Sequence, residues 1–214
     1  MKKTAILFVL AAMIGCNNAG NKETANAPKA DSPAVAAKPE TPPPPPMDSA
    51  TMMKKYQEYM TPGEMHKMLA SWDGKWTTES TFWMDEKAPP SKSTGSCENK
   101  MILGGRYQQS IHTSSMMGQP FEGVGMTGYD NGKKVFVSTW QDNMGTGIMY
   151  LEGPYDTATK TMTLKGSYVD PVKGKTDVRQ TFKIVDDKNQ YMEMYGTTAG
   201  GKEMKWMEMK LVKK

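Results

Sequence analysis

The sequence predicts an all-β protein: an antiparallel, up-and-down β-barrel of about ten strands, with an N-terminal helix that closes one end. From Lys75 onward, apolar and polar residues alternate with period two, which is typical of half-buried strands. Turn signals separate these runs roughly every 10–15 residues, and an amphipathic helical stripe stands just ahead of them. Closure into a barrel is expected because an open sheet of that many strands would leave two bare edges.

The first sixteen residues have the pattern of a bacterial lipoprotein signal. Lys2 and Lys3 precede an apolar run over 5–15 that is too short to span a bilayer, and Met-Ile-Gly-Cys at 13–16 resembles a lipobox. We therefore expect a signal peptide over 1–15 and lipidation of Cys16, which would anchor the chain to a membrane of the bacterial cell envelope. Asn17 favours the outer membrane, facing the periplasm. The alternative is an ordinary signal peptide with a chance cysteine.

Residues 16–50 are predicted to form a disordered tether rich in alanine and proline. The segment has no aromatic residue, and its five consecutive prolines at 42–46 favour extended polyproline II structure. Its expected role is to hold a folded domain, 51–214, away from the membrane. A docking site for a proline-reading domain is the alternative.

The folded part contains a helix predicted over 62–71. Thr61 and Glu64 stand at capping-box spacing around its start, and Gly74 is placed to end it. The residues that recur at helical spacing on its apolar face are Met65, Met68, Leu69 and Trp72. The segment 52–59 fits either another helix or an ordered lead-in.

Ten strands are predicted from the alternation and the turn signals. They are expected near 75–83, 93–102, 106–113, 121–129, 133–141, 146–153, 161–168, 177–185, 190–197 and 203–212. Asn131-Gly132 is the strongest hairpin signal between them. Glycines inside the strand patterns, such as Gly123 and Gly125, indicate either bends at barrel corners or room for a ligand.

Composition and motifs argue against several classes of protein. The net charge of +4 falls to +2 without Lys2 and Lys3 of the leader, so no nucleic-acid partner is expected. Two cysteines are too few for a disulfide scaffold and two histidines too few for a His-rich metal site. The sequence has no nucleophile elbow, zinc-protease motif, CxxC or P-loop, and it predicts no cofactor.

Several segments resemble known families. Gly74-Lys75-Trp76 after a helix is similar to the opening of lipocalins and calycins, in which this Trp closes one barrel end beneath a basic side chain. Longer segments are similar to the domain of unknown function family 1579, over roughly 61–214. They lie at 66–76, 102–107, 118–130, 138–147 and 153–156, and Asp170-Pro171, Arg179 and 193–195 continue the match. The resemblance implies a lipocalin-like barrel, often secreted or lipid-anchored, without a settled activity. Cys97 departs from the family pattern.

The expected function is non-catalytic binding of a small apolar or amphipathic ligand inside the barrel, including one with an acidic group. The predicted apolar wall consists of Trp76, Tyr107, Trp140, Met149 and Tyr195. Arg106 and Arg179 are the only arginines beside 25 lysines, so they are the candidates for a charge clamp, with Asp142 as a further polar group. The alternative is structural pairing of the arginines, for example of Arg179 with Trp76 or Asp142.

Three alternatives stay open at this point. A hydrolase-type enzyme would use a His/Asp/Arg site in the barrel, with His112 and Arg106 at the same strand parity. The 18 methionines after Met47, Met192 and Met194 among them, are soft ligands for Cu(I), although no His or Cys stands beside them in the sequence. A solid-core barrel would be a structural or partner-binding module. Cys97 is expected to be a half-buried strand residue rather than a nucleophile. The sequence does not fix the oligomeric state.

Overall fold

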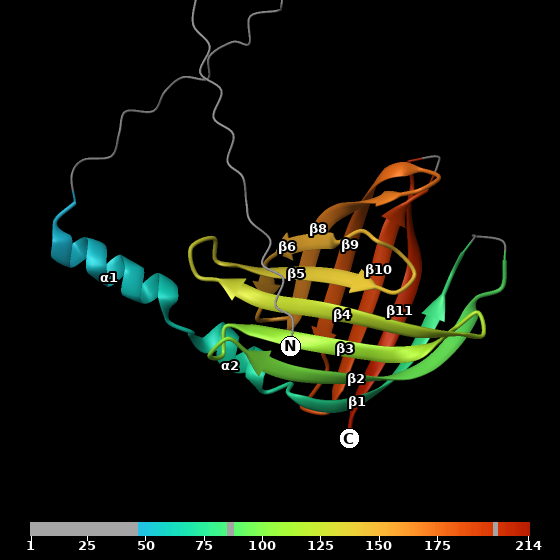
Figure 1. Ribbon diagram of the computed structural model, residues 1–214, viewed down its shortest axis with the longest axis horizontal. Helices are drawn as coiled ribbons and strands as arrows, with labels where there is room; N and C mark the ends of the chain where they lie inside the picture. Colours follow the sequence, from blue (N-terminus) through green and yellow to red (C-terminus); the bar gives the residue numbers. More distant parts are fainter. Residues whose placement is uncertain (1–46, 85–87, 199–200) are drawn as a thin grey trace, which may run out of the picture. The chain divides into compact units, whose positions relative to one another are not determined.

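The structure is a computed structural model that describes residues 47–84, 88–198 and 201–214. The predicted signal peptide, Cys16 and the predicted tether up to residue 46 lie outside the described residues. Figure 1 shows two short helices followed by an antiparallel sheet that curls back on itself.

The helices are α1 (Ser49–Met60) and α2 (Glu64–Ala70). The strands are β1 (Gly74–Phe82), β2 (Ser91–Ile102), β3 (Tyr107–Met116), β4 (Gln119–Asp130), β5 (Val135–Asp142), β6 (Met149–Gly153), β7 (Tyr155–Asp156), β8 (Thr161–Asp170), β9 (Gly174–Ile184), β10 (Asn189–Thr197) and β11 (Glu203–Lys213).

The sheet closes into a barrel. Its order is β6-β5-β4-β3-β2-β1-β11-β10-β9-β8-β7, and β6 also pairs with β8, which places Leu151 opposite Gly166. This pairing joins the two ends, so ten strands form a closed ring and the two-residue β7 lies beside β8. Closure leaves the long strands without a free edge. The predicted fold class is confirmed, and each predicted strand is present within a few residues.

The segment from α2 to the start of β1 closes one end of the barrel. Leu69 and Trp76 are completely buried, and Trp72 packs against Phe182 with ring centroids 5.7 Å apart. Burial of each large apolar side chain of this kind contributes roughly 1.5–3 kcal/mol. Lys213 Nζ lies 5.6 Å from the centroid of the Trp76 ring. Trp76 therefore closes the barrel beneath a basic side chain, as the family resemblance implied.

Hydrogen bonds attach this closing segment (residues 64–76, called the plug below) to the barrel wall. The side-chain amide of Gln108 on β3 donates to the Leu69 carbonyl at 2.6 Å and to Asp73 Oδ1 at 3.1 Å. Asp73 Oδ2 accepts from the Met101 N–H at 2.9 Å. These bonds satisfy polar groups at the end of α2 that burial would otherwise leave unpaired.

The start of α2 differs slightly from the prediction. The helix begins at Glu64, and the residue before it, Gly63, is the N-cap in place of Thr61. His66 Nδ1 accepts a hydrogen bond from the Gly63 N–H at 3.0 Å, so the histidine three residues along the chain takes the reciprocal place of a capping box.

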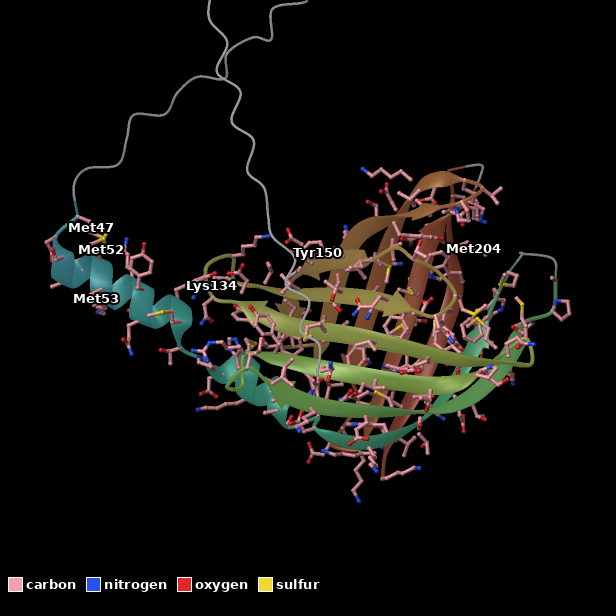
Figure 2. All side chains as sticks on the ribbon, viewed as in Figure 1. Met47, Met52, Met53, Lys134, Tyr150 and Met204 are labelled. Carbon is pink, nitrogen blue, oxygen red and sulfur yellow. The ribbon has the colours of Figure 1, made fainter. Side chains whose placement is uncertain are left out.

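The segment before α2 is a helix, α1, with no buried residue. Its apolar side chains Met52 and Met53 are exposed (Figure 2). Two barrel turns bind its C-terminal end: Arg106 Nη2 donates to the Met60 carbonyl at 2.7 Å, and Asn131 Nδ2 donates to three neighbouring carbonyls. Within the described residues, neither helix is long and apolar enough to cross a membrane.

Three hairpin turns share one design. In each, an aspartate accepts hydrogen bonds from two following N–H groups, and the fourth residue after it has a positive φ. These positive-φ residues are Lys134, Lys160 and Gly174, with φ of 59°, 53° and 76°. The predicted Asn-Gly hairpin therefore forms, but its left-handed residue is Lys134 rather than Asn131 or Gly132.

Candidate functional site

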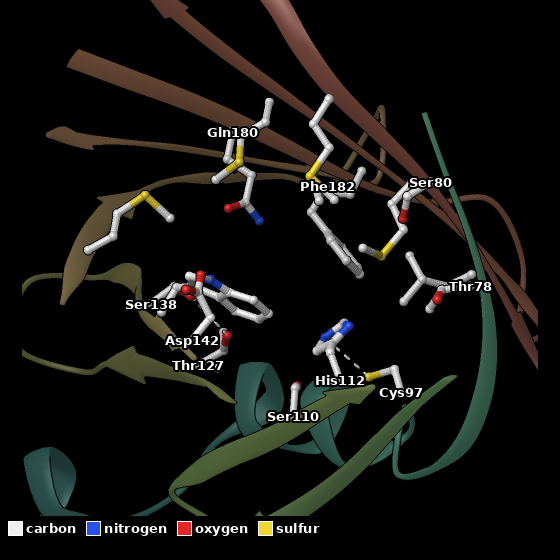
Figure 3. Close-up of a pocket in the computed structure, with 18 of the residues that line it drawn as sticks. Thr78, Ser80, Cys97, Ser110, His112, Thr127, Ser138, Asp142, Gln180 and Phe182 are labelled. Atoms are coloured by element: carbon white, nitrogen blue, oxygen red, sulfur yellow. Dashed lines mark hydrogen bonds between the residues drawn. The ribbon is translucent and has the colours of Figure 1, made fainter. Parts of the chain in front are cut away.

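The barrel encloses a cavity. It has a volume of about 300 Å³, at the lower end of the range usual for small-molecule sites (Figure 3). Residues from β1 to β6 and from β8 to β11 line it, as does Trp72 of the plug. The alternative of a barrel packed solid is therefore wrong.

One wall of the cavity is mainly apolar and comes from β8 to β11, where Gln180 is the polar exception. Met192 on β10 lies opposite Met209 on β11, and Met194 lies opposite Met207, so four methionines form two cross-strand pairs in the lining. The other apolar side chains of this wall are Met162, Leu164, Phe182 and Leu211. Thioethers are flexible and polarisable, so this wall adapts to apolar ligands of different shapes.

The wall from β2 to β5 is mainly polar, although Met116, Phe121 and Trp140 also line it. Alternate residues of these strands face inward and carry hydroxyl, thiol, imidazole, amide and carboxylate groups. They are Cys97, Asn99, Gln108, Ser110, His112, Thr127, Ser138 and Asp142. Asp142 is the only acidic or basic side chain, histidine aside, among the described residues that line the cavity. The site thus offers an apolar surface and a polar surface to one small ligand.

Cys97 and His112 form a pair in the polar wall. They lie opposite each other on β2 and β3, and Cys97 Sγ is 3.3 Å from His112 Nε2 (Figure 3). The thiol also donates to Asn99 Oδ1 at 3.1 Å. Burial, with a smaller effect of Glu98, raises the pKa of Cys97 to about 12, and burial lowers the pKa of His112 to about 4. Both side chains are therefore neutral near pH 7.

This charge state opposes nucleophilic catalysis. A cysteine attacks as its thiolate, which an adjacent base or positive charge normally stabilises. Here the thiol of Cys97 has a much higher pKa than the imidazole of His112, so the proton stays on sulfur. The pair presents two neutral donor groups to the cavity rather than an activated nucleophile.

Trp140 and Asp142 on β5 contact each other, and Trp140 also contacts His112 of the pair. Trp140 Nε1 donates to Asp142 Oδ2 at 2.8 Å, and the Met144 N–H donates to Asp142 Oδ1 at 3.0 Å. The Trp140 indole meets the His112 ring edge-on, with centroids 5.2 Å apart. The carboxylate is therefore held in place by two donors while it lines the cavity.

Three of the predicted site residues line the cavity: Trp140, Asp142 and Met149. That they bind a ligand stays a prediction. Trp76 does not line the cavity, because it lies in the plug with its Nε1 donating to the Trp72 carbonyl at 2.9 Å.

Arg106 and Tyr107 lie outside the cavity, which corrects the predicted clamp and part of the predicted wall. Arg106 is in the turn between β2 and β3, where its guanidinium binds backbone carbonyls, the shortest bond being 2.7 Å to Met60. The turn breaks the strand parity that would have placed Arg106 beside His112. Tyr107 is 39% exposed because its neighbour Gln108 occupies the inward position.

Arg179 and Tyr195 also lie outside the cavity. The Arg179 guanidinium binds both carboxylate oxygens of Glu203, at 2.8 and 2.7 Å, and stands 3.9 Å from the centroid of the Tyr195 ring. Arg179 therefore does form a structural pair, but its partner is Glu203 rather than Trp76 or Asp142. Both arginines make their contacts outside the cavity, so the His/Asp/Arg enzyme site lacks its arginine.

Cys97 and His112 were not predicted to be neighbours, because they are 15 residues apart in the sequence. The sequence did contain a signal for this pairing. The turn of residues 103–106 is centred on Gly104-Gly105, both with positive φ, and a hairpin folded about that centre places residue 97 opposite residue 112. The same pairing supplies the Cys and His that the methionine cluster lacks in sequence.

Among the described residues, no group of three or more His, Cys, Asp or Glu side chains could hold a metal ion.

The profile of a family described as protein of unknown function (DUF1579) matches residues 61–213. The chain belongs to the DUF1579 family.

One solved structure supports the fold of this DUF1579 protein. Rv2717c from M. tuberculosis matches with a TM-score of 0.56 at 11% identity, over 72% of this chain and 99% of that chain. A redesigned β-barrel matches with a TM-score of 0.36 at 14% identity, over 68% and 94%. At this identity, the likeness to Rv2717c shows the fold alone. No curated protein matches the chain.

Proposed function

We propose that this DUF1579 protein binds a small amphipathic ligand inside its barrel without converting it. The observation that carries the proposal is the two-sided cavity of about 300 Å³, with methionines on one wall and hydroxyl, imidazole and amide groups on the other. Such a lining favours a ligand with an apolar body and one polar end.

The charged groups that line the cavity indicate which charge the ligand can carry. No lysine or arginine is among the described residues that line the cavity, and its single carboxylate belongs to Asp142. A buried anionic group would have no cation to pair with and would face that carboxylate. The ligand is therefore neutral or basic. This replaces the expectation of an acidic group, which depended on the arginines.

Displacement of an environment-sensitive fluorescent dye tests this proposal with three eight-carbon compounds: octanol, octylamine and octanoate. Octanol and octylamine should displace the dye at lower concentrations than octanoate, because only octanoate carries a negative charge into the cavity. Equal binding of all three would contradict the charge argument, and binding of none would contradict the proposed function.

Two variants on β5 locate the binding. Ser138 lines the cavity, so Ser138→Phe should fill it and weaken octanol binding. Gln141 alternates with the cavity-lining Trp140 and Asp142, so Gln141→Phe is a matched control on the outer face and should leave binding unchanged. Circular dichroism checks that both variants remain folded. If they behave alike, binding is not inside the barrel.

We also propose that the protein is anchored in the bacterial envelope through lipid on Cys16, with the barrel on the periplasmic side of the outer membrane. The lipobox-like residues 13–16 and the proline-rich segment after them support this. Feeding cells an alkyne-labelled fatty acid should label the wild-type chain and not Cys16→Ser. Equal labelling of both chains, or of neither, would contradict the anchor.

A further inference from the structure

The Cys97–His112 pair lies in a cavity rich in sulfur. Besides the thiol, eight methionines contribute to the lining: Met116, Met144, Met149, Met162, Met192, Met194, Met207 and Met209. Thiolate and thioether sulfur and imidazole nitrogen are the donors preferred by soft monovalent metal ions. The folded barrel thus places a thiol, an imidazole and several thioethers around one space.

We propose that the barrel holds one Cu(I) ion, bound by Cys97 Sγ and His112 Nε2, with a thioether of the four cavity-lining methionines on β10 and β11 as a further ligand. The two named donor atoms are 3.3 Å apart, so both reach a single ion by small side-chain movements. Their places on neighbouring strands fix this geometry without any loop.

Charge favours a monovalent ion. When Cu(I) binds, the Cys97 S–H bond breaks, a Cu–S bond forms, and the proton leaves to solvent without any change of oxidation state. The resulting Cu(I)–thiolate unit is neutral overall, so its burial leaves no uncompensated charge in the cavity. A divalent ion would leave a net positive charge there. Hard ions would also lack the oxygen ligands that they prefer.

The neighbouring charged groups do not oppose this site. Glu98 is next to Cys97 on β2 and affects its pKa, and Asp142 lines the cavity from β5. No lysine or arginine is present in the described lining to repel the ion. Asn99 Oδ1, which accepts the thiol hydrogen bond at 3.1 Å, keeps the sulfur turned along this wall.

The test is an anaerobic titration of the full chain with Cu(I), supplied as its acetonitrile complex against the competing chelator bicinchoninate. We expect one tightly bound ion per chain and a new near-ultraviolet absorption band from the copper–thiolate bond. Cys16→Ser is the first control, because the chain has two cysteines and Cys16 is the other one. It should bind Cu(I) like the wild type.

Variants of the ligands give the decisive results. Cys97→Ser and His112→Gln should each weaken Cu(I) binding by roughly 100-fold, and Cys97→Ser should also abolish the absorption band. Met192→Leu/Met194→Leu should weaken binding by roughly tenfold, whereas Met52→Leu/Met53→Leu on exposed α1 should not. Unchanged binding in Cys97→Ser would overturn the site. Equal effects of the two methionine double variants would overturn a thioether ligand from β10.

This inference does not depend on the proposed function. The Cu(I) titration uses the metal alone, and the dye displacement uses metal-free protein, so loss of Cu(I) binding and loss of ligand binding are separate results. If Cu(I) binds tightly but no compound displaces the dye, the metal site stands and the proposed ligand binding is wrong. If octanol displaces the dye but Cu(I) does not bind, the ligand binding stands and the metal site is wrong.

Discussion

Gly123 lies beneath the indole ring of Trp140: a Cβ atom at position 123 would stand 2.5 Å from Trp140 Cη2 and closer still to Cζ2. The ring covers this position on β4 and meets His112 edge-on. The glycine in this strand therefore makes room for the Trp140 side chain, a role that differs from both expectations, a bend in the strand or room for a ligand.

Gly123→Ala should destabilise the protein by about 1–3 kcal/mol, because the added methyl group must displace the Trp140 ring. Urea unfolding followed by tryptophan fluorescence measures the change. Gly145→Ala is the matched control, since a Cβ there meets no atom within 4 Å. Equal stability of the two variants would show that Trp140 does not pack as described.

Gln190→Met should stabilise the protein by about 1–2 kcal/mol. The Gln190 side chain is 1% exposed, and neither of its amide atoms has a hydrogen-bond partner among the described residues. Gln108→Met should have the opposite effect, because it removes the buried bond to the Leu69 carbonyl at 2.6 Å. Thermal unfolding compares the pair. A loss of stability in Gln190→Met would mean that its amide does have a partner, such as bound water.

Arg106→Met should release the C-terminal end of α1 without reducing octanol binding. Its guanidinium binds the Met60 carbonyl and the turn, outside the cavity. Limited proteolysis should therefore cut faster near residue 60 in this variant than in the wild type. Arg179→Met, which breaks the distant contacts with Glu203 and Tyr195, serves as the control. Loss of octanol binding in Arg106→Met would instead support the predicted role of Arg106 as a charge clamp for the ligand.

Lys134→Gly should stabilise the protein by roughly 0.5–1 kcal/mol, because Lys134 occupies a left-handed conformation with φ of 59°. Gly174 has the same place in the corresponding β8–β9 turn, with φ of 76°, so Gly174→Lys should destabilise by about 1 kcal/mol. Chemical unfolding of both variants tests the shared turn design. Changes of the same sign would argue against it.

The stability of the metal-free protein should fall as the pH is lowered from about 7 to about 5. Burial lowers the pKa of His112 to about 4 from 6.5, and it also lowers the pKa of His66. The unfolded chain then binds more protons in this range, so stability is complete above about pH 6.5 and decreases as the pH falls toward 4. For His112 the loss amounts to at most roughly 3 kcal/mol.

Urea midpoints between about pH 7 and pH 5 measure this effect. The double variant His66→Gln/His112→Gln should have a nearly flat profile, because glutamine keeps a hydrogen-bonding group without titrating. A profile as steep as that of the wild type would assign the pH dependence to other groups.

Most of the fold was predictable from the sequence because each strand has one side toward the barrel interior, which produces the alternation. The strands of the C-terminal half, such as β10 with Met192 and Met194, show this clearly. On β3, serine, threonine and glutamine occupy both faces, so the sequence did not reveal that Gln108 rather than Tyr107 points inward.

The site was predictable only in part. Trp140, Asp142 and Met149 share the inward side of β5 and β6, and aromatic or apolar strand residues are reasonable guesses for a lining. Arg106 and Arg179 were misplaced because their rarity indicates a geometric role but not which side of the wall they serve. The Cys97–His112 contact depends on hairpin register, which only the Gly104-Gly105 turn signalled.

Methionine methyl NMR tests the central claim, that the barrel interior is the binding site, most directly. With the methyl groups of all methionines labelled, added octanol should shift the resonances of the cavity methionines, such as Met192 and Met209, and leave Met52 and Met53 on α1 unchanged. Shifts confined to the α1 methionines, or no shifts at saturating octanol, would contradict it.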